Sequence, residues 1–435
     1  MSSSTTLCNF DTRHVIRSLC RICNFVSEIV PVLSRYKQGL TSIFRRVHEL
    51  KSDPYEHRLL ALEIQEELLG RVSRAERAIR KLRAANKAIK VQLAQRGNPR
   101  ELARQLQNDH KGNEAKIDLY KELLGIYGDI GDSIAFIYGD RWDLKQVAWK
   151  EKAGFITGKR GARLERAILR HTFEVGAVGV LNDLTNSLRH GDITVFREDG
   201  VFGLVEVKSG RGGKRSRAER QVAAAERVLA FLRDDRDETE SGEIRIRHAW
   251  ATEPVYHLEA INGLIAEVPA NGWVHREVEK GLHYLVIADE VADEAMSNVL
   301  GHIGNRKAVV FLANNYKRLG VAYYPFILSM SDADKLYSFY NGEFVIVVLA
   351  DIDTLSEAHI PSGYVLRITD DEGAPWALED TGSSQGNGEP VLRMGRHIIG
   401  RIASEFLSAG SLLGHMIEGP LARVKSASPE RSPEL

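Results

Sequence analysis

Acidic and basic side chains stand at fixed spacing on two short apolar segments near the middle of the chain. Asp192 opens the segment DITVFR, and Glu206 and Lys208 stand two residues apart in VFGLVEVKSG. Carboxylates are hard oxygen donors that suit Mg²⁺ or Mn²⁺, and an ammonium group stabilises developing negative charge. Brought to one place, these three groups would combine metal binding with electrostatic stabilisation.

The alternation of apolar and polar residues predicts that both segments are β-strands. Asp199-Gly200 lies between them and is typical of a hairpin turn. Residues two apart in a strand project from one face, so Glu206 and Lys208 share a face. Pairing across the turn brings Asp192 close to both.

An acid-x-Lys pattern alone carries little information. The chain has four further matches, Glu49-Leu50-Lys51, Asp109-His110-Lys111, Glu114-Ala115-Lys116 and Asp143-Leu144-Lys145. All four fall in the predicted helical part, where positions two apart lie on different faces. The alternative for Glu206 and Lys208 is a solvent-facing ion pair on an edge hairpin.

This strand–turn–strand arrangement resembles the PD-(D/E)xK, or restriction-endonuclease-like, nuclease superfamily over about residues 155–250. Asp192 matches the first acid of the family and Glu206-Val207-Lys208 the second element. Gly191 stands where the pattern has Pro. Glu165, in the predicted helix GARLERAIL, stands about where many members carry a further acid.

The helix after Lys208 matches the family only in part. Gln221 takes the place of a frequent Gln, whereas Ala225 stands where a Tyr would follow. The resemblance implies a restriction-endonuclease-like α/β core, a mixed sheet flanked by helices.

The resemblance also implies a Mg²⁺-dependent (or Mn²⁺-dependent) nuclease that hydrolyses phosphodiester bonds, in DNA more than in RNA. Asp192, Glu206, the backbone carbonyl of Val207 and Glu165 would bind metal. Lys208 would orient water or stabilise the charged transition state. A role in bacterial anti-phage defence or restriction follows by analogy alone.

Basic residues next to this pattern are candidates for binding nucleic acid. The glycine-rich segment after Lys208 and the helix that follows supply Arg211, Lys214, Arg215, Arg217 and Gln221, and Lys159 and Arg160 form a second, weaker group. Cations at a helix N-terminus oppose the helix dipole, which favours a bound phosphate there. The alternative is a flexible loop before a basic helix.

The N-terminal part predicts a helical hairpin. Asp53-Pro54 is typical of a helix start and RGNP, at residues 96–99, of a break. Apolar residues alternate at four and three positions between them, forming the seam Leu68, Val72, Ala75, Ile79, Leu82, Asn86, Ile89 and Leu93. Asn86 is the one polar member and is expected to fix the register. Whether the seam also pairs between chains is left open.

The outer faces of the first helix are strongly basic. Eleven Lys or Arg residues lie from Arg71 to Arg104, and only Glu76 and Glu101 oppose them. Two interpretations remain open: a solvated face paired with acids elsewhere, or a surface that follows phosphates.

Composition and patterning predict five segments. Residues 1–11 are expected to be disordered, 12–153 helical and coiled-coil-like, 154–255 nuclease-like, 256–420 a C-terminal α/β accessory domain, and 421–435 a disordered tail. In the accessory domain HYLVIADE, KAVVFLAN, EFVIVVLADI and YVLRIT predict buried strands. The formal net charge is zero, which argues against a uniformly basic protein.

Three cysteines and no apolar stretch of about 20 residues predict a cytoplasmic protein that does not enter a membrane. The expected partner is nucleic acid, DNA above all, and the N-terminal helices could form a homo-oligomer. Two other hypotheses are a catalytically inactive nuclease fold that binds nucleic acid, and an oligomeric scaffold built on the helical hairpin.

Overall fold

The computed structural model describes most of the chain from Leu33 onward. The described residues are 33–141, 143–144, 155–159, 161–188, 190–198, 202–207, 215–238, 244–246, 248–250, 252–269, 272–288, 294–295, 298–299, 301, 307–317, 324–371, 373–381 and 390–421. The predicted disorder at 1–11 lies outside them, as does all but the first residue of 421–435.

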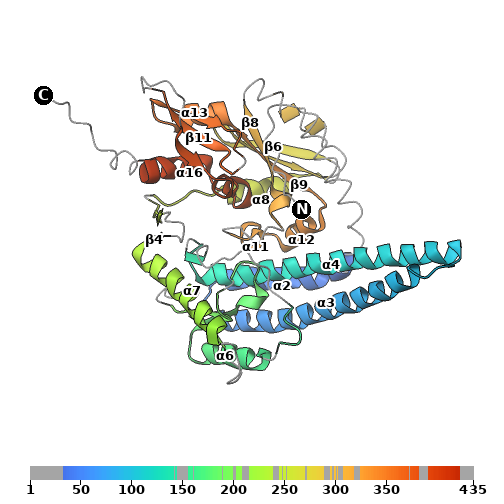
Figure 1. The fold of residues 1–435 in the computed structure, drawn as a ribbon. Helices are drawn as coiled ribbons and strands as arrows, with labels where there is room; N and C mark the ends of the chain where they lie inside the picture. Colours follow the sequence, from blue (N-terminus) through green and yellow to red (C-terminus); the bar gives the residue numbers. More distant parts are fainter. Residues whose placement is uncertain are drawn as a thin grey trace. The chain divides into compact units, whose positions relative to one another are not determined.

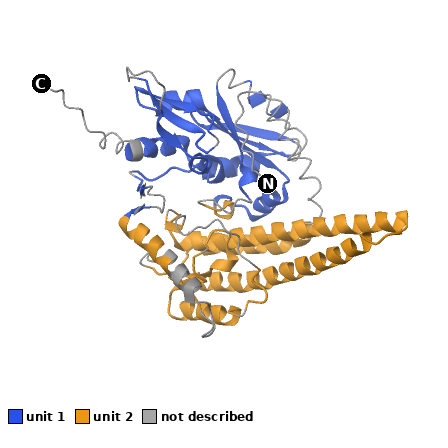
Figure 2. Ribbon diagram, viewed as in Figure 1, with its two compact units in different colours: residues 1–30, 235–317, 329–435 blue, residues 31–234, 318–328 orange. Residues whose placement is uncertain are grey.

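The chain divides into two compact units (Figure 2). Unit 2 comprises Pro31–Asp234 and Arg318–Leu328, and unit 1 comprises Met1–Val30, Asp235–Lys317 and Ser329–Leu435. The division does not fall between residues 153 and 154. Residues 31–153 of the predicted helical region and the greater part of the predicted nuclease-like region therefore lie in one unit.

Three helices begin unit 2 (Figure 1). After the short η1, Ser34–Tyr36, come α2, Lys37–Ser52, α3, Arg58–Leu93, and α4, Arg100–Tyr138. The predicted break at RGNP is confirmed. The predicted start is wrong by four residues, since the N-cap is His57 and not Asp53. The Asp53 carboxylate accepts from the Glu56 amide at 3.2 Å, but in a turn that precedes α3.

The apolar seam of α3 packs against α4 of the same chain. Most seam positions are buried, including Leu68 and Ile79, which have no exposed surface. Asn86 is 4% exposed; it donates to Glu114 at 2.5 Å and accepts from Asn113 at 2.9 Å, both on α4. A buried amide satisfied only in one alignment fixes the register of the hairpin.

A three-stranded antiparallel sheet follows the helices. Its strands, in the order β1-β2-β3, are β1, Val178–Leu181, β2, Ile193–Phe196, and β3, Phe202–Val205. Helix α6, Ala162–Glu174, precedes the sheet, η2, Asn182–Leu184, follows β1, and α7, Arg215–Asp234, follows β3. The predicted hairpin is present, with Ile193 opposite Val205 and Phe196 opposite Phe202. Strand β1 was not predicted.

Buried polar contacts attach β1 to the helical hairpin. Gln65 of α3 is fully buried; its side chain donates to the Gly179 carbonyl at 2.9 Å and accepts from the Leu181 amide at 2.9 Å. The side chain thus completes hydrogen bonds on the free edge of β1. This edge is covered within the unit, as unpaired strand edges generally need to be.

Glycines on α4 let the segment before β2 approach closely. A Cβ at Gly131 would lie 2.1 Å from the Leu184 carbonyl oxygen, and one at Gly128 would lie 2.2 Å from Oδ1 of Asn186. Asp132 then accepts from the amides of Asn186 and Ser187 at 3.2 and 3.1 Å. Helix α4 therefore holds the loop that leads to the candidate site.

Unit 1 is built around an antiparallel sheet of order β6-β7-β9-β8. Its strands are β6, Trp273–Glu279, β7, Leu282–Ile287, β8, Ala308–Leu312, and β9, Val345–Asp351. Strands β7 and β9 are buried along their whole length, as their continuous apolar sequences predict. Leu285, Val347 and Leu349 belong to one core cluster.

The remaining strands of unit 1 form two smaller antiparallel sheets. They are β4, Arg236–Glu238, and β5, Ile244–Ile246, in one sheet, and β10, Tyr364–Ile368, β11, Trp376–Asp380, and β12, Pro390–Met394, in the other. The strands predicted in HYLVIADE, KAVVFLAN, EFVIVVLADI and YVLRIT are confirmed as β7, β8, β9 and β10.

Short helices complete the described chain. They are α8, Leu258–Glu267, α10, Ala313–Tyr316, α11, Phe326–Ser329, α12, Ala333–Asn341, α13, Ile352–His359, α14, Arg396–Ile399, α15, Arg401–Ser404, α16, Ala409–Met416, and η3, Ile417–Leu421. No helix in the described ranges is both long and apolar enough to cross a membrane.

The protein is thus a mixed helical and sheet structure with a long helical region at its N-terminal end. Every strand pairing among the described residues is antiparallel. The mixed sheet expected from the family resemblance is not seen within that part of the chain.

Candidate functional site

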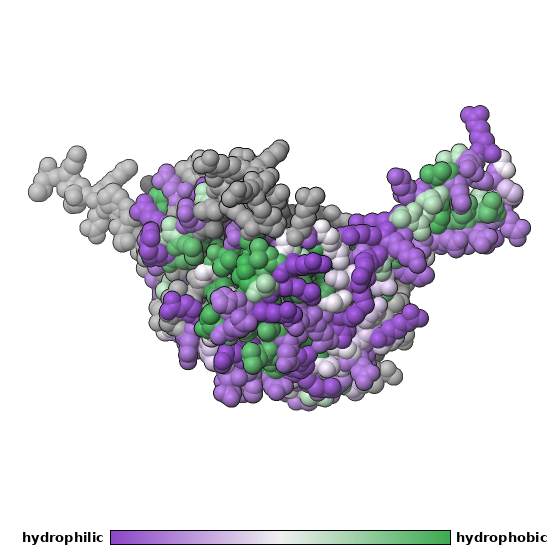
Figure 3. All heavy atoms as spheres, turned by 90° about the horizontal axis from the view of Figure 1, so that it is seen from below, coloured by the Kyte–Doolittle hydropathy of each residue, from purple (hydrophilic) through white to green (hydrophobic). Residues whose placement is uncertain are grey.

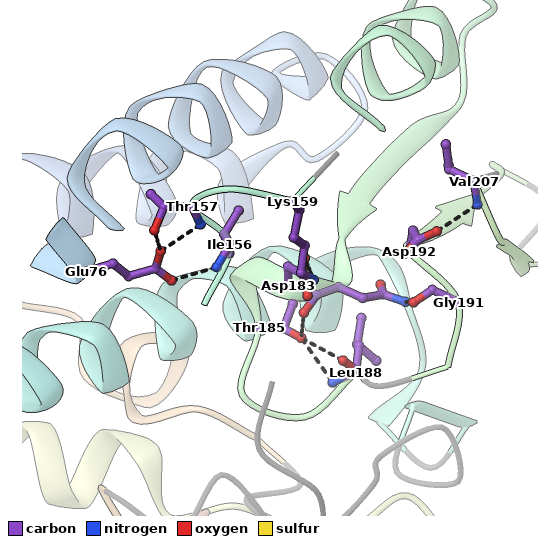
Figure 4. Close-up of polar contacts among 11 residues, drawn as sticks. Glu76, Ile156, Thr157, Lys159, Asp183, Thr185, Leu188, Gly191, Asp192 and Val207 are labelled. Atoms are coloured by element: carbon purple, nitrogen blue, oxygen red, sulfur yellow. Dashed lines mark hydrogen bonds and ion pairs between the residues drawn. The ribbon is translucent and has the colours of Figure 1, made fainter. Parts of the chain in front are cut away.

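Asp192 lies directly before β2, and backbone and side-chain contacts both fix it. Its amide donates to the Val205 carbonyl at 2.9 Å and its carbonyl accepts from the Asn182 amide at 3.0 Å. Its Oδ2 accepts from the Val207 amide at 2.7 Å, so the carboxylate faces the segment that follows β3 (Figure 4). The two halves of the predicted motif are therefore adjacent.

Gly191, directly before Asp192, has a backbone conformation that requires glycine. Its φ is +75°, and a Cβ there would lie 3.1 Å from the Val205 carbonyl oxygen. Proline is locked near a φ of about −65° and cannot take this conformation. Glycine adopts it at little cost, so the turn before Asp192 needs this residue.

Asn182 organises the approach to Asp192. Its side-chain amide donates to the carbonyls of His190 and Gly191 at 2.7 and 3.1 Å, and its Oδ1 accepts from Thr194 at 2.8 Å. The residue is 3% exposed. Asn182 is a positioning residue that the sequence interpretation missed, because one Asn before a strand has no distinguishing pattern.

Glu165 lies in the first turn of α6 and is 8% exposed. Burial raises the pKa of its carboxyl group, and the negative charges of Asp192, Asp183 and Glu206 raise it further, while Lys159 opposes them. Three other carboxylates thus lie close enough to act on Glu165. The Glu165 side chain lies over Gly161, where a Cβ would be 2.7 Å from its Oε1.

Lys159 forms an ion pair with Asp183 of η2. Figure 4 shows this pair beside the turn that carries Gly191 and Asp192. Asp183 was not among the predicted site residues; its segment LNDL is short and gives no spacing signal. Lys159 was predicted to bind phosphate, and in the structure it balances part of the negative charge of the site.

The segment that carries Lys159 is fixed to α3. The Glu76 carboxylate accepts from the amides of Ile156 and Thr157, each at 2.8 Å, and from the Thr157 hydroxyl. Glu76 is 3% exposed. It therefore serves an internal contact. The sequence places Glu76 among the acids that oppose the basic outer face of α3, but its carboxylate does not lie on that face.

The predicted site residues divide into three groups. Asp192, Glu206, Val207, Glu165 and Lys159 are described and lie in one neighbourhood. Lys208, Arg160, Arg211 and Lys214 lie outside the described residues. Arg215, Arg217 and Gln221 belong to α7, whose backbone is described there while these side chains are not.

The described side chains do not form a ready metal cage. In the described part of the chain, no three or more His, Cys, Asp or Glu side chains gather closely enough to hold a metal ion. The contacts at hand are the Val207 amide on Asp192 and Lys159 on Asp183. The donors themselves are carboxylate oxygens, the kind that Mg²⁺ and Mn²⁺ prefer.

Comparison with known proteins adds no relative. No protein-family model matches the chain. No curated protein matches it. No solved structure matches it either.

Proposed function

We propose that the protein is a divalent-metal-dependent nuclease that hydrolyses phosphodiester bonds. One observation carries the proposal: the Asp192 carboxylate accepts from the Val207 amide at 2.7 Å, which joins the first acid to the Glu206-Val207-Lys208 segment. An isolated solvent-facing Glu–Lys pair on an edge hairpin would not require this contact. The preference for DNA over RNA, and a role in defence or restriction, rest on the family resemblance alone.

The carboxylates suit a divalent cation in kind and in charge. Burial and the negative charges of Asp192, Asp183 and Glu206 raise the pKa of Glu165, so the ionised form of Glu165 is disfavoured in the folded protein without a cation. Asp192 and Glu206 would hold Mg²⁺ or Mn²⁺, with Glu165 and the Val207 carbonyl as further ligands. The bound metal would supply Lewis-acid stabilisation and a more acidic water.

The chain's own residues supply the remaining functions. Asn182 and Gly191 hold the turn so that Asp192 faces β3. Lys208 directly follows Val207 in the sequence and is assigned to the charge that develops on the phosphate during cleavage. Asp183 holds Lys159 beside the site, where the ammonium group of Lys159 would lie close to an anionic substrate.

The hypothesis of an oligomeric scaffold gains no support from the α3 seam. It relied on the α3 seam as a surface for pairing between chains. That seam packs on α4 of the same chain, and its one polar member, Asn86, finds its partners there.

The test is incubation of the full chain with supercoiled, linear and single-stranded DNA and with RNA, each in Mg²⁺, in Mn²⁺ and in EDTA. We expect cleavage that requires the metal and is greatest on DNA. Cleavage that persists in EDTA would contradict the assignment, as would binding to all substrates without any metal-dependent cleavage. The latter result would favour the inactive, nucleic-acid-binding alternative.

A further inference from the structure

The outer faces of α3 carry cations that the candidate site does not use. Ten exposed Lys or Arg residues lie between positions 74 and 104: Arg74, Arg77, Arg80, Lys81, Arg83, Lys87 and Lys90 on α3, Arg96 after its end, and Arg100 and Arg104 on α4. With Glu76 buried, Glu101 is the one exposed acid in that span. A solvated helix surface ordinarily mixes both signs, so a nearly single-sign surface calls for an anionic partner.

Four of these cations form one row. Arg80, Arg83, Lys87 and Lys90 are spaced three, four and three residues apart, which places them along one side of the helix. We call this row the cationic stripe. No carboxylate pairs with Arg83, Lys87 or Lys90 among the residues that the structure describes.

The stripe leads toward the candidate site. The guanidinium groups of Arg80 and Arg83 lie 5.2 and 5.5 Å from the centroid of the Phe155 ring. Phe155 directly precedes Ile156 and Thr157, whose amides donate to Glu76 of α3, and Lys159, the partner of Asp183, follows two residues after Thr157. Positive charge therefore runs from the outer half of α3 to the edge of the carboxylate cluster within a single compact unit.

The stripe is suited to phosphates and not to bases. Residues 71–118 contain no Phe, Tyr or Trp, and the Phe155 ring already carries two guanidinium groups. Single-strand binders usually stack bases on aromatic side chains, which this surface does not offer. The outer parts of α3 and α4 extend beyond the sheet of unit 2 (Figure 1). On the face seen in Figure 3, this part of the two helices carries hydrophilic side chains around an apolar patch near its end.

The dimensions agree with a duplex. The ten residue steps of α-helix from Arg80 to Lys90 span about 15 Å. Double-stranded DNA carries one phosphate per strand for about every 3.4 Å of axis, so that length matches about four phosphates of one strand. Four cations on one side of α3 thus correspond in number to the phosphates they would face.

We propose that the cationic stripe binds the phosphate backbone of double-stranded nucleic acid and directs the duplex toward the Asp192 site. This rests on the proposed function for its substrate class, but the binding surface is separate from the residues that would hold metal. Backbone contacts of this kind carry no sequence information and depend strongly on salt.

The test measures binding without cleavage. A fluorescent 30-base-pair DNA duplex is titrated with the full chain in EDTA at several salt concentrations, and anisotropy is recorded. The double variant K87A/K90A removes two stripe cations. R74A/K81A, whose two exposed positions lie seven residues apart on another side of the same helix, is the control with the same charge change. Alanine is the best helix former, so both variants should keep α3 intact, which circular dichroism checks.

We expect K87A/K90A to weaken duplex binding about tenfold or more near 0.1 M salt and to reduce the slope of log affinity against log salt by about two. R74A/K81A should change the affinity less than threefold. Equal losses in both variants would overturn the stripe, since binding would then depend only on total charge. So would tighter binding of a single strand than of the duplex, or no duplex binding.

This result is separable from the nuclease assignment. Cleavage that requires Asp192, together with no effect of K87A/K90A on binding, would reject the stripe and keep the nuclease. Binding that depends on Lys87 and Lys90, with no metal-dependent cleavage, would reject the nuclease and keep the stripe.

Discussion

The amide of Val207 donates a hydrogen bond to Oδ2 of Asp192 at 2.7 Å, across the pair of strands β2 and β3. The backbone pairing continues to this point, because the Asp192 amide donates to the Val205 carbonyl. A carboxylate at the start of one strand therefore sits against the backbone that separates Glu206 from Lys208. This hydrogen bond places Asp192 next to the Glu206-Val207-Lys208 segment, although the two are about 15 positions apart in the sequence.

Replacing Asn182 should damage both the fold and the site. In Asn182→Ala the carbonyls of His190 and Gly191 and the Thr194 hydroxyl lose a buried partner. A buried polar group left unsatisfied costs about 1–3 kcal/mol, so we expect a loss of stability of at least that size in urea unfolding. Cleavage should fall because the turn no longer holds Asp192.

The positioning role of Asn182 has a distinct signature. The Mg²⁺ concentration for half-maximal cleavage should rise in Asn182→Ala under conditions where the variant is fully folded. An unchanged Mg²⁺ requirement with reduced stability would mean that Asn182 serves the fold alone.

Adding a methyl group to Gly131 should destabilise unit 2. The new Cβ would lie 2.1 Å from the Leu184 carbonyl oxygen, which belongs to backbone and cannot rotate away. Overpacking of this kind costs about 1–3 kcal/mol, measured as the free energy of unfolding. Gly112→Ala on the same helix is the matched control, since nothing lies within 4 Å of its Cβ.

The control should gain up to about 1 kcal/mol, because alanine replaces glycine inside a helix. Equal behaviour of Gly131→Ala and Gly112→Ala would show that α4 and the loop before β2 do not approach as closely as described.

The raised pKa of Glu165 predicts how stability depends on pH. Burial and the charges of Asp192, Asp183 and Glu206 favour its protonated form in the folded state. Its contribution is therefore fully present below the unfolded pKa of about 4.5 and is lost as pH rises through the raised folded pKa. Glu165→Gln should be more stable than the parent protein near neutral pH in EDTA.

The same substitution separates stability from activity. Glu165→Gln should reduce metal-dependent cleavage while it raises thermal stability in EDTA. Glu174→Gln, at an exposed carboxylate on the same helix, should change neither. If Glu165→Gln were less stable than the parent near neutral pH, the charge repulsion inferred at this site would be wrong.

Local patterns in the sequence were sufficient to predict several elements. The alternation in DITVFR and the Asp199-Gly200 turn predicted the β2–β3 hairpin, and the seam from Leu68 to Leu93 predicted the pairing of α3 with α4. Both signals concern residues near one another in the chain. The four-residue strand β1 gave no comparable signal, because a short apolar run fits several structures.

Long-range contacts could not be predicted in the same way. The attachment of β1 to Gln65 joins residues more than 110 positions apart, and the contact between Glu76 and Thr157 joins residues 81 positions apart. A single sequence gives no sign of such pairs. For the same reason the sequence did not predict Asn182 and Asp183 as site residues, since their roles depend on contacts with His190, Gly191 and Lys159.

The most direct measurement is Mg²⁺-dependent cleavage of supercoiled DNA by Asp192→Asn and Lys208→Met, beside Glu174→Gln as the control. Asn at 192 keeps an oxygen that can accept from the Val207 amide but lacks the negative charge, so the fold should survive. We predict at least a 100-fold loss of cleavage in the first two variants, an activity of the control within about twofold of the parent, and intact melting curves in all three; removing a positioned charged group from a catalytic site typically has effects of this order. Parent-like cleavage in Asp192→Asn and Lys208→Met would contradict the assignment of this site.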